Sequence, residues 1–113
     1  MENLILEVEK YVSSLLRDNL SHTFVYHNLG HTQRVVKYAK ELAEGLTLTE
    51  EDTENVTIAA WFHDTGYIND INNHESEGVK IAQRFLKDKG LDSNRIELIS
   101  SLISATKLGY SPS

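Results

Sequence analysis

Hydrophobic residues recur along the chain at spacings of three and four, which is the period of an amphipathic α-helix. This pattern predicts a first helix over about residues 2–20. Further helices are expected over about residues 28–45, 50–64, 74–90 and 93–109. Thr49, which three acids follow, is the expected N-cap of the third helix, and Ser93 is the expected cap of the fifth. The sequence has no alternation of apolar and polar residues of the kind that marks a β-strand. The fold class is therefore expected to be all-α, a compact helical bundle of about five helices.

The second predicted helix carries a histidine near its start. Asn28 is a good N-cap for this helix, and residues 21–28 are expected to form a connector before it. His31 extends the apolar stripe of the helix toward its N-terminus. The side chains expected to be buried on this stripe are Val35, Ala39, Leu42 and Leu46.

Composition narrows the range of partners. The 113 residues are enough for one small domain, and 40% hydrophobic with 25% charged residues is ordinary for a soluble globular protein. The net charge is -6, and no basic run is present that could follow a phosphate backbone, so long nucleic acid is not an expected partner. The chain has no cysteine, no apolar stretch long enough to span a membrane, and no basic start of a signal peptide. We expect a cytoplasmic protein without a membrane partner.

Short connections make consecutive helices antiparallel neighbours, which converts positions in the sequence into places in the bundle. The start of the second helix, the end of the third, the start of the fourth and the end of the fifth should meet at one pole. The groups that these four segments carry are His31, then His63 with Asp64, then His74 with Glu75, and finally Lys107. This convergence predicts a polar functional site at that pole.

Each of these groups also has a structural explanation, and from the residues alone these alternatives stay open. His31 can be a histidine at the edge of the core. His74 and Glu75 can belong to an ordinary first helical turn, and Lys107 can complement the dipole at a helix C-terminus. A bare His-Asp pair such as residues 63–64 is weak evidence for a metal site, because such pairs often occur at surfaces or helix ends.

Four short motifs carry a resemblance to a known family. They cover residues 26–32 (YHNLGHT), 59–66 (AAWFHDTG), 73–77 (NHESE) and 104–107 (SATK). Together they resemble the successive motifs of the HD-domain superfamily of metal-dependent phosphohydrolases, in order and in spacing. The resemblance extends over about residues 24–108.

The resemblance implies an all-helical HD-domain-like fold and a divalent metal held by His31, His63 and Asp64. The family's final aspartate ligand, from a helix after the SATK segment, has no counterpart before Ser113. We therefore expect residues 1–113 to form a single HD-like domain that is the N-terminal part of a longer one and lacks its C-terminal helices. The missing helices would leave an apolar face uncovered, through which the chain could form a homo-oligomer.

The implied chemistry is hydrolysis of a phosphate ester or anhydride in a small, nucleotide-like substrate. Imidazole and carboxylate ligands suit Mn²⁺, Fe²⁺, Co²⁺, Ni²⁺ or Zn²⁺ better than Mg²⁺. Such an ion polarises a phosphoryl oxygen and generates hydroxide from its bound water. Asp70 or Glu75 could orient that water or act as general acid or base, although a solvated loop acid is the more ordinary identity of Asp70.

Three further groups are expected to meet the substrate. Lys107 is the expected cation for the charge that develops on phosphate, with a purely structural role equally open. The resemblance implies that His27 contacts the substrate or supports a metal ligand, with a structural buried histidine equally open. His74 opens a helix whose backbone N–H groups suit phosphate. The rival hypothesis is a non-catalytic HD-type module that binds a ligand or a partner protein as a sensory part of a longer chain.

Overall fold

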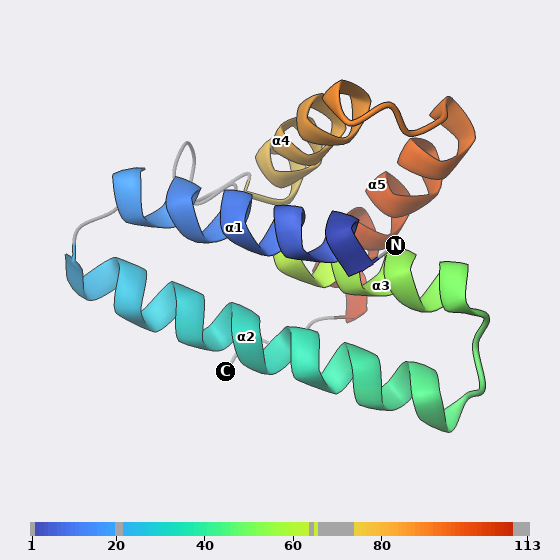
Figure 1. Ribbon diagram of the computed structural model, residues 1–113. Helices are drawn as coiled ribbons and strands as arrows, with labels where there is room; N and C mark the ends of the chain where they lie inside the picture. Colours follow the sequence, from blue (N-terminus) through green and yellow to red (C-terminus); the bar gives the residue numbers. More distant parts are fainter. Residues whose placement is uncertain (1, 20–21, 64, 66–73, 110–113) are drawn as a thin grey trace.

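The computed structural model describes residues 2–19, 22–63, 65 and 74–109. Five helices account for nearly all of these residues, and Figure 1 shows them in sequence colours. Their bounds are α1 (Glu2–Asn19), α2 (His22–Gly45), α3 (Glu50–Phe62), α4 (His74–Asp88) and α5 (Ser93–Gly109).

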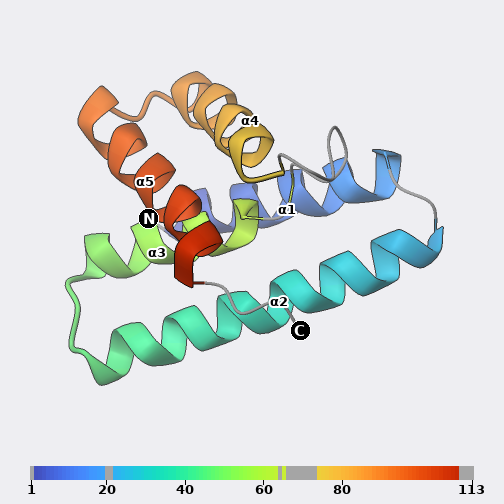
Figure 2. The same cartoon turned by 180° about the vertical axis from the view of Figure 1, so that it is seen from behind.

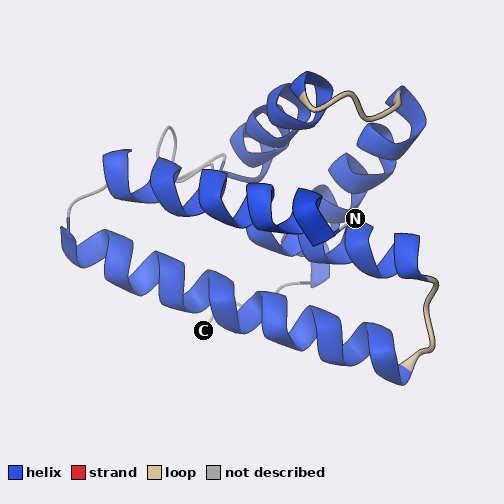
Figure 3. Ribbon diagram, viewed as in Figure 1, coloured by secondary structure: helices blue, strands red, loops and turns tan. Residues whose placement is uncertain are grey.

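Helix α3 lies at the centre of the bundle. It packs against each of the other four helices. The front and back views agree that α2 lies on one side of α3 and the α4–α5 pair on the other (Figures 1 and 2). Helix α1 covers α2 and α3 together. Figure 3 shows only helices and connecting loops in the described residues, with no strand among them, which confirms the all-α prediction.

The sequence of α3 explains its central position. Only its first turn, Glu50 to Asp52, is fully exposed, and every residue from Thr57 to Phe62 is buried. The segment from Val56 to Phe62 has Thr57 as its only polar residue, and a helical segment that is apolar on nearly all sides is stable only when other elements surround it. Its N-terminus is closed by Thr49, whose Oγ1 accepts a hydrogen bond from the backbone N–H of Asp52 at 3.0 Å, as the run of acids after it predicted.

Helices α1, α4 and α5 contribute one apolar stripe each, with the spacing of three and four residues that the sequence predicts. An aromatic group joins three helices: Tyr11 of α1 stacks on Phe85 of α4 with ring centroids 4.4 Å apart, and Phe62 of α3 lies 5.9 Å from Phe85. Burying one such side chain contributes about 1.5–3 kcal/mol. The fully buried stripe residues are Val8, Val12 and Leu16 of α1, Ala82 and Leu86 of α4, and Ile99 and Ile103 of α5.

The predicted start of the second helix was wrong. Helix α2 begins at His22, so the expected connector over residues 21–28 is helical from residue 22 onward. Asn28 and Gly30 lie inside the helix rather than before or at its start. Each costs a helix interior at most about 1 kcal/mol, which tertiary packing can offset, and the segment contains no proline. His31 is therefore an interior residue of α2.

The predicted buried stripe of α2 was also wrong in part. Leu42 and Leu46 are 64% and 63% exposed, while Val35 and Ala39 are half-buried. The buried residues of α2 lie one position further along, where the small or β-branched side chains of Thr32, Val36 and Ala43 are almost fully covered. Small side chains let two helices approach closely, and this preference outweighed the larger leucines. The face made by Leu42 and Leu46 is left on the outside.

The last two helices begin and end close to the predicted places. Helix α4 starts at His74 as expected, and the turn after it has Gly90 at φ 84°, a conformation that favours glycine. The expected cap of α5 was Ser93, but Asp92 caps this helix instead. Its Oδ1 accepts a hydrogen bond from the backbone N–H of Arg95 at 2.8 Å. Among the described helices, none combines the length and the apolar composition that a membrane crossing requires.

Candidate metal centre

His31 of α2 and His63 at the end of α3 lie side by side. Their ring centroids are 5.5 Å apart, with the planes tilted by 51°. The antiparallel hairpin explains this proximity: His31 lies fourteen positions before Gly45, and His63 lies thirteen positions after Glu50. Arms of nearly equal length on both sides of a short turn bring the two histidines level, although His31 is not at the start of its helix. The predicted convergence of these two residues is observed.

The ring of His63 is fixed by the backbone of its own helix. The side chain is only 4% exposed, and its Nδ1 lies 2.6 Å from the carbonyl oxygen of Ala60. A carbonyl can only accept, so Nδ1 carries the proton and donates it. The lone pair of the ring is then on Nε2. Metal-binding histidines are held in the same way, with one ring nitrogen donating to a carbonyl and the other facing the ion.

Thr65 completes the end of α3. Its Oγ1 donates a hydrogen bond to the carbonyl oxygen of Phe62 at 2.8 Å, and the side chain is fully buried. The last carbonyls of a helix have no partner within the helix. Here His63 and Thr65 satisfy two of them with side chains, at Ala60 and Phe62. The two residues on either side of Asp64 are thereby anchored to α3.

Gly78 brings α4 against this same corner. A Cβ added at Gly78 would lie 3.0 Å from the carbonyl oxygen of Phe62 and 3.6 Å from Oγ1 of Thr65. Only glycine permits so close an approach without a shift of one helix. Gly78 was not among the site residues predicted from the sequence. A glycine inside a helical pattern, where it is unfavourable by about 1 kcal/mol, was the signal that could have revealed it.

Not all predicted site residues fall in the described part of the chain. Asp64 and Asp70 lie outside the described residues, so their roles stay predictions. Four further predicted residues, apart from His31 and His63, are placed by their backbone only. His74 and Glu75 open α4 and Lys107 lies in the last turn of α5, as expected, whereas His27 is inside α2 rather than before it. The side chains of these four residues are outside the description, and their roles also stay predictions.

The donor set can be compared with what a metal requires. Among the described residues no group of three histidine, aspartate or glutamate side chains gathers at one point. The described pair, His31 and His63, supplies two imidazoles, and Asp64 follows His63 directly in the sequence. Two nitrogens with an adjacent carboxylate fit a divalent transition metal better than Mg²⁺ or Ca²⁺.

Residues 28–111 match the family model of the HD domain. The chain belongs to the HD domain family. HD domains are part of a superfamily of metal-dependent phosphohydrolases, and they typically bind divalent metals. The matched region of this HD domain includes His31, His63 and Asp64. Neither a search of curated proteins nor a search of solved structures gave a match.

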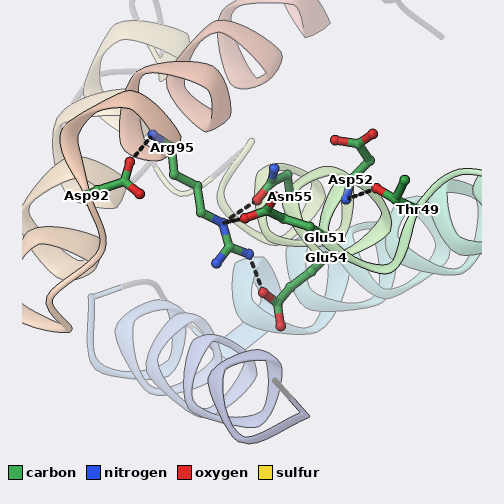
Figure 4. A network of polar contacts seen from close by, with 7 residues as sticks. All are labelled: Thr49, Glu51, Asp52, Glu54, Asn55, Asp92 and Arg95. Carbon is green, nitrogen blue, oxygen red and sulfur yellow. Dashed lines mark hydrogen bonds and ion pairs between the residues drawn. The ribbon is translucent and has the colours of Figure 1, made fainter.

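A second polar cluster lies at the opposite end of α3 in the HD domain. Arg95 of α5 donates from Nε to Oδ1 of Asn55 at 2.6 Å and from its terminal nitrogen to the buried carboxylate of Glu54 (Figure 4). Glu51 lies 3.9 Å from the same guanidinium. We call Glu51, Glu54, Asn55 and Arg95 the Arg95 cluster. Sequence reasoning missed it, because 41 residues separate Glu54 from Arg95 and no local motif links them.

A groove of about 460 Å³ also lies away from the two histidines. It runs between α1, α2 and the N-terminal half of α3. Ile5 and Leu6 form its apolar wall, and Lys40 with several glutamates forms its rim. Of the predicted site residues, His31 and His63 have described side chains, and neither lines this groove.

Proposed function

We propose that this HD domain is a metal-dependent phosphohydrolase that acts on the phosphate ester or anhydride of a small, nucleotide-like substrate. The observation that carries the proposal is the pairing of His31 and His63, with rings 5.5 Å apart. The hydrogen bond from His63 to Ala60 supports it further, because it leaves the lone pair on the nitrogen that a metal would need.

In this proposal His31, His63 and Asp64 hold one divalent ion, with Mn²⁺, Fe²⁺, Co²⁺, Ni²⁺ or Zn²⁺ preferred by the donor set. Such an ion, when bound, supplies a Lewis acid for the phosphoryl oxygen and a water acidified to hydroxide. Ala60 and Thr65 keep the end of α3 in a fixed geometry, so that His63 needs no rearrangement to bind.

The other predicted residues act on the substrate. The backbone N–H groups at the start of α4, from His74 onward, suit a phosphate oxygen. Lys107 balances the negative charge of the transition state, and His27 contacts the substrate beside it. Asp70 or Glu75 moves the proton of the attacking water. The position of α4 supports this part of the proposal, since Gly78 sets its first turns directly against the end of α3.

Metal analysis tests the proposal most directly. The protein is purified without added metal, loaded with Mn²⁺ or Zn²⁺, dialysed, and measured by mass spectrometry. We expect about one ion per chain and its loss in His63→Ala, because one of the ligands is gone. The matched control is His22→Ala, which removes a histidine of the same helix to which the proposal gives no role. A protein that binds no ion after loading would contradict the proposal.

Activity is tested separately on a panel of nucleoside monophosphates, triphosphates and cyclic nucleotides. Formation of phosphate or nucleoside, or of nucleoside monophosphate from a cyclic nucleotide, that depends on the loaded ion and disappears in His63→Ala would support catalysis. A chain that binds the ion and a nucleotide but turns over no member of the panel would instead be a non-catalytic HD-type module. The ion measurement and the turnover measurement therefore distinguish the two hypotheses.

A further inference from the structure

An apolar stripe runs along the outer face of α2. Tyr38, Leu42 and Leu46 are 71%, 64% and 63% exposed. Tyr38 and Leu42 lie one above the other on α2. Leu46 follows in the turn directly after Gly45, and its backbone N–H donates to the carbonyl oxygen of Leu42 at 2.9 Å, so it continues the same row. Among the described helices, α2 packs only against α1 and α3, and both views place it at the outside of the bundle (Figures 1 and 2). We call these three residues the Tyr38 stripe. Single exposed leucines are ordinary, but a continuous row of large side chains marks an interaction surface.

The charges beside the Tyr38 stripe change sign along the helix. Arg34 and Lys37 lie on its flank toward the N-terminus, and Glu41 lies on the same flank one turn further along. All three side chains are exposed. A second α2 placed antiparallel would bring the basic end of this flank to the acidic end of its copy. The surface is thus complementary in charge to itself, which is the property that a two-fold symmetric contact requires.

We propose that the Tyr38 stripe binds a second copy of this chain, with the two α2 helices antiparallel about a two-fold axis. Tyr38 packs on Leu42 of the partner subunit, and Lys37 lies beside Glu41 of the partner subunit. Each contact occurs twice because the arrangement is symmetric. This inference does not depend on the proposed hydrolase activity, because none of its residues belongs to the metal centre.

The strength of this association follows from its size. Three large apolar residues per subunit make a smaller interface than the roughly 800 Å² per partner of a stable complex. We therefore expect dimers with a dissociation constant of micromolar order or weaker, in equilibrium with monomers. Sedimentation equilibrium over a wide range of protein concentrations measures this constant directly.

Leu42→Glu is the first variant to test. It places two unpaired charges in the contact and removes two buried leucines, so we expect at least about a hundredfold weaker association. The residue is exposed in the subunit, so the fold should tolerate the change, and circular dichroism checks this. The matched control is Leu98→Glu, an exposed leucine of α5 outside the stripe. Equal weakening by the control, or a wild-type chain that is monomeric at all concentrations, would overturn the proposal.

A charge exchange tests the antiparallel orientation itself. Lys37→Glu and Glu41→Lys each place like charges opposite one another, so each variant alone should dissociate. A mixture of the two variants restores an attractive pair on both sides of the axis and should associate about as well as the wild type. A parallel contact, or a surface meant for another partner, gives no such recovery in the mixture. Absence of recovery while both variants are folded would therefore refute the arrangement.

Discussion

The two ends of α3 use polar side chains in different ways. At the N-terminal end, Arg95 meets a buried carboxylate, an amide oxygen and a second carboxylate, so that opposite groups face one another. At the C-terminal end, the ring of His63 is oriented by a backbone carbonyl of its own helix, and the neighbouring group is another imidazole. The first arrangement joins α3 to α5. The second places two groups of the same kind side by side, and in the proposed function it serves ligand binding rather than cohesion.

This difference predicts different responses to mutation. A group that compensates a buried charge should affect stability strongly when it is removed. A group that orients a metal ligand should affect metal binding more than stability. Three sets of variants, in order of decreasing loss of stability, test whether one end of α3 determines stability and the other metal binding.

Arg95→Ala should cause the largest loss of stability. The side chain of Glu54 is 5% exposed and would be left as an uncompensated buried carboxylate, at a cost of about 3–5 kcal/mol. Denaturant unfolding followed by circular dichroism measures the change. Lys80→Ala is the control, since it breaks an exposed pair with Glu77 at 3.1 Å and should cost less than about 0.5 kcal/mol.

The double variant Arg95→Met with Glu54→Leu sharpens the same test. It removes both charges together and should recover most of the stability lost in Arg95→Ala, because apolar residues can replace a buried ion pair. Metal affinity of the folded protein should stay close to the wild-type value in both variants. A large drop in metal affinity would mean that the two ends of α3 are not independent.

Gly78→Ala should have an intermediate effect. The new Cβ would lie 3.0 Å from the carbonyl oxygen of Phe62, so α4 must move away from the end of α3, at a cost of about 1–3 kcal/mol. Thermal and denaturant unfolding measure this loss. Gly30→Ala is the matched control inside α2: its Cβ meets only the Arg34 side chain at 3.7 Å, and it should stabilise the helix by up to about 1 kcal/mol. Equal responses of the two glycines would show that α4 does not depend on this close approach.

Thr65→Val should have the smallest effect on stability and a clear effect on metal binding. It removes one hydrogen bond to Phe62 with little change of shape, which costs about 1 kcal/mol. Loss of such a support typically weakens metal affinity by about 10–100-fold. Isothermal titration with Zn²⁺ measures the affinity, and Thr65→Ser, which keeps the hydroxyl, should bind nearly as the wild type does. A stability loss without any change in affinity would place Thr65 with the structural groups.

The sequence predicted the helices best where local chemistry decides them. Thr49 with its following acids marked the start of α3, and the start of α4 at His74 was also found. The start of α2 was missed because its first residues contain no strong breaker, so that Asn28 resembled a cap although the helix already begins at His22. The buried face of α2 was displaced by one residue, because two neighbouring apolar stripes have the same period and only the partner helix selects between them.

The candidate site was predictable only in outline. His31 and His63 were expected to meet because a short turn makes their helices antiparallel, and they do. The contacts that support His63 could not be predicted from the sequence. The hydrogen bond to the Ala60 carbonyl and the close approach at Gly78 depend on how the helix ends are positioned. The Arg95 cluster could not be predicted either. It joins α3 and α5, which are not consecutive, and hydrophobic periodicity does not determine the register between two such helices.

The central position of α3 also bears on motion. A helix that packs against every other helix cannot open by itself, so its amide hydrogens should exchange with solvent only when the whole domain unfolds. His63 caps this helix, so its backbone should also become exposed only on unfolding of the whole domain. The ring of His63 would then keep nearly the same orientation in the metal-free protein. The dissociation rate of a bound ion would be set by the ligands that come from less constrained parts of the chain.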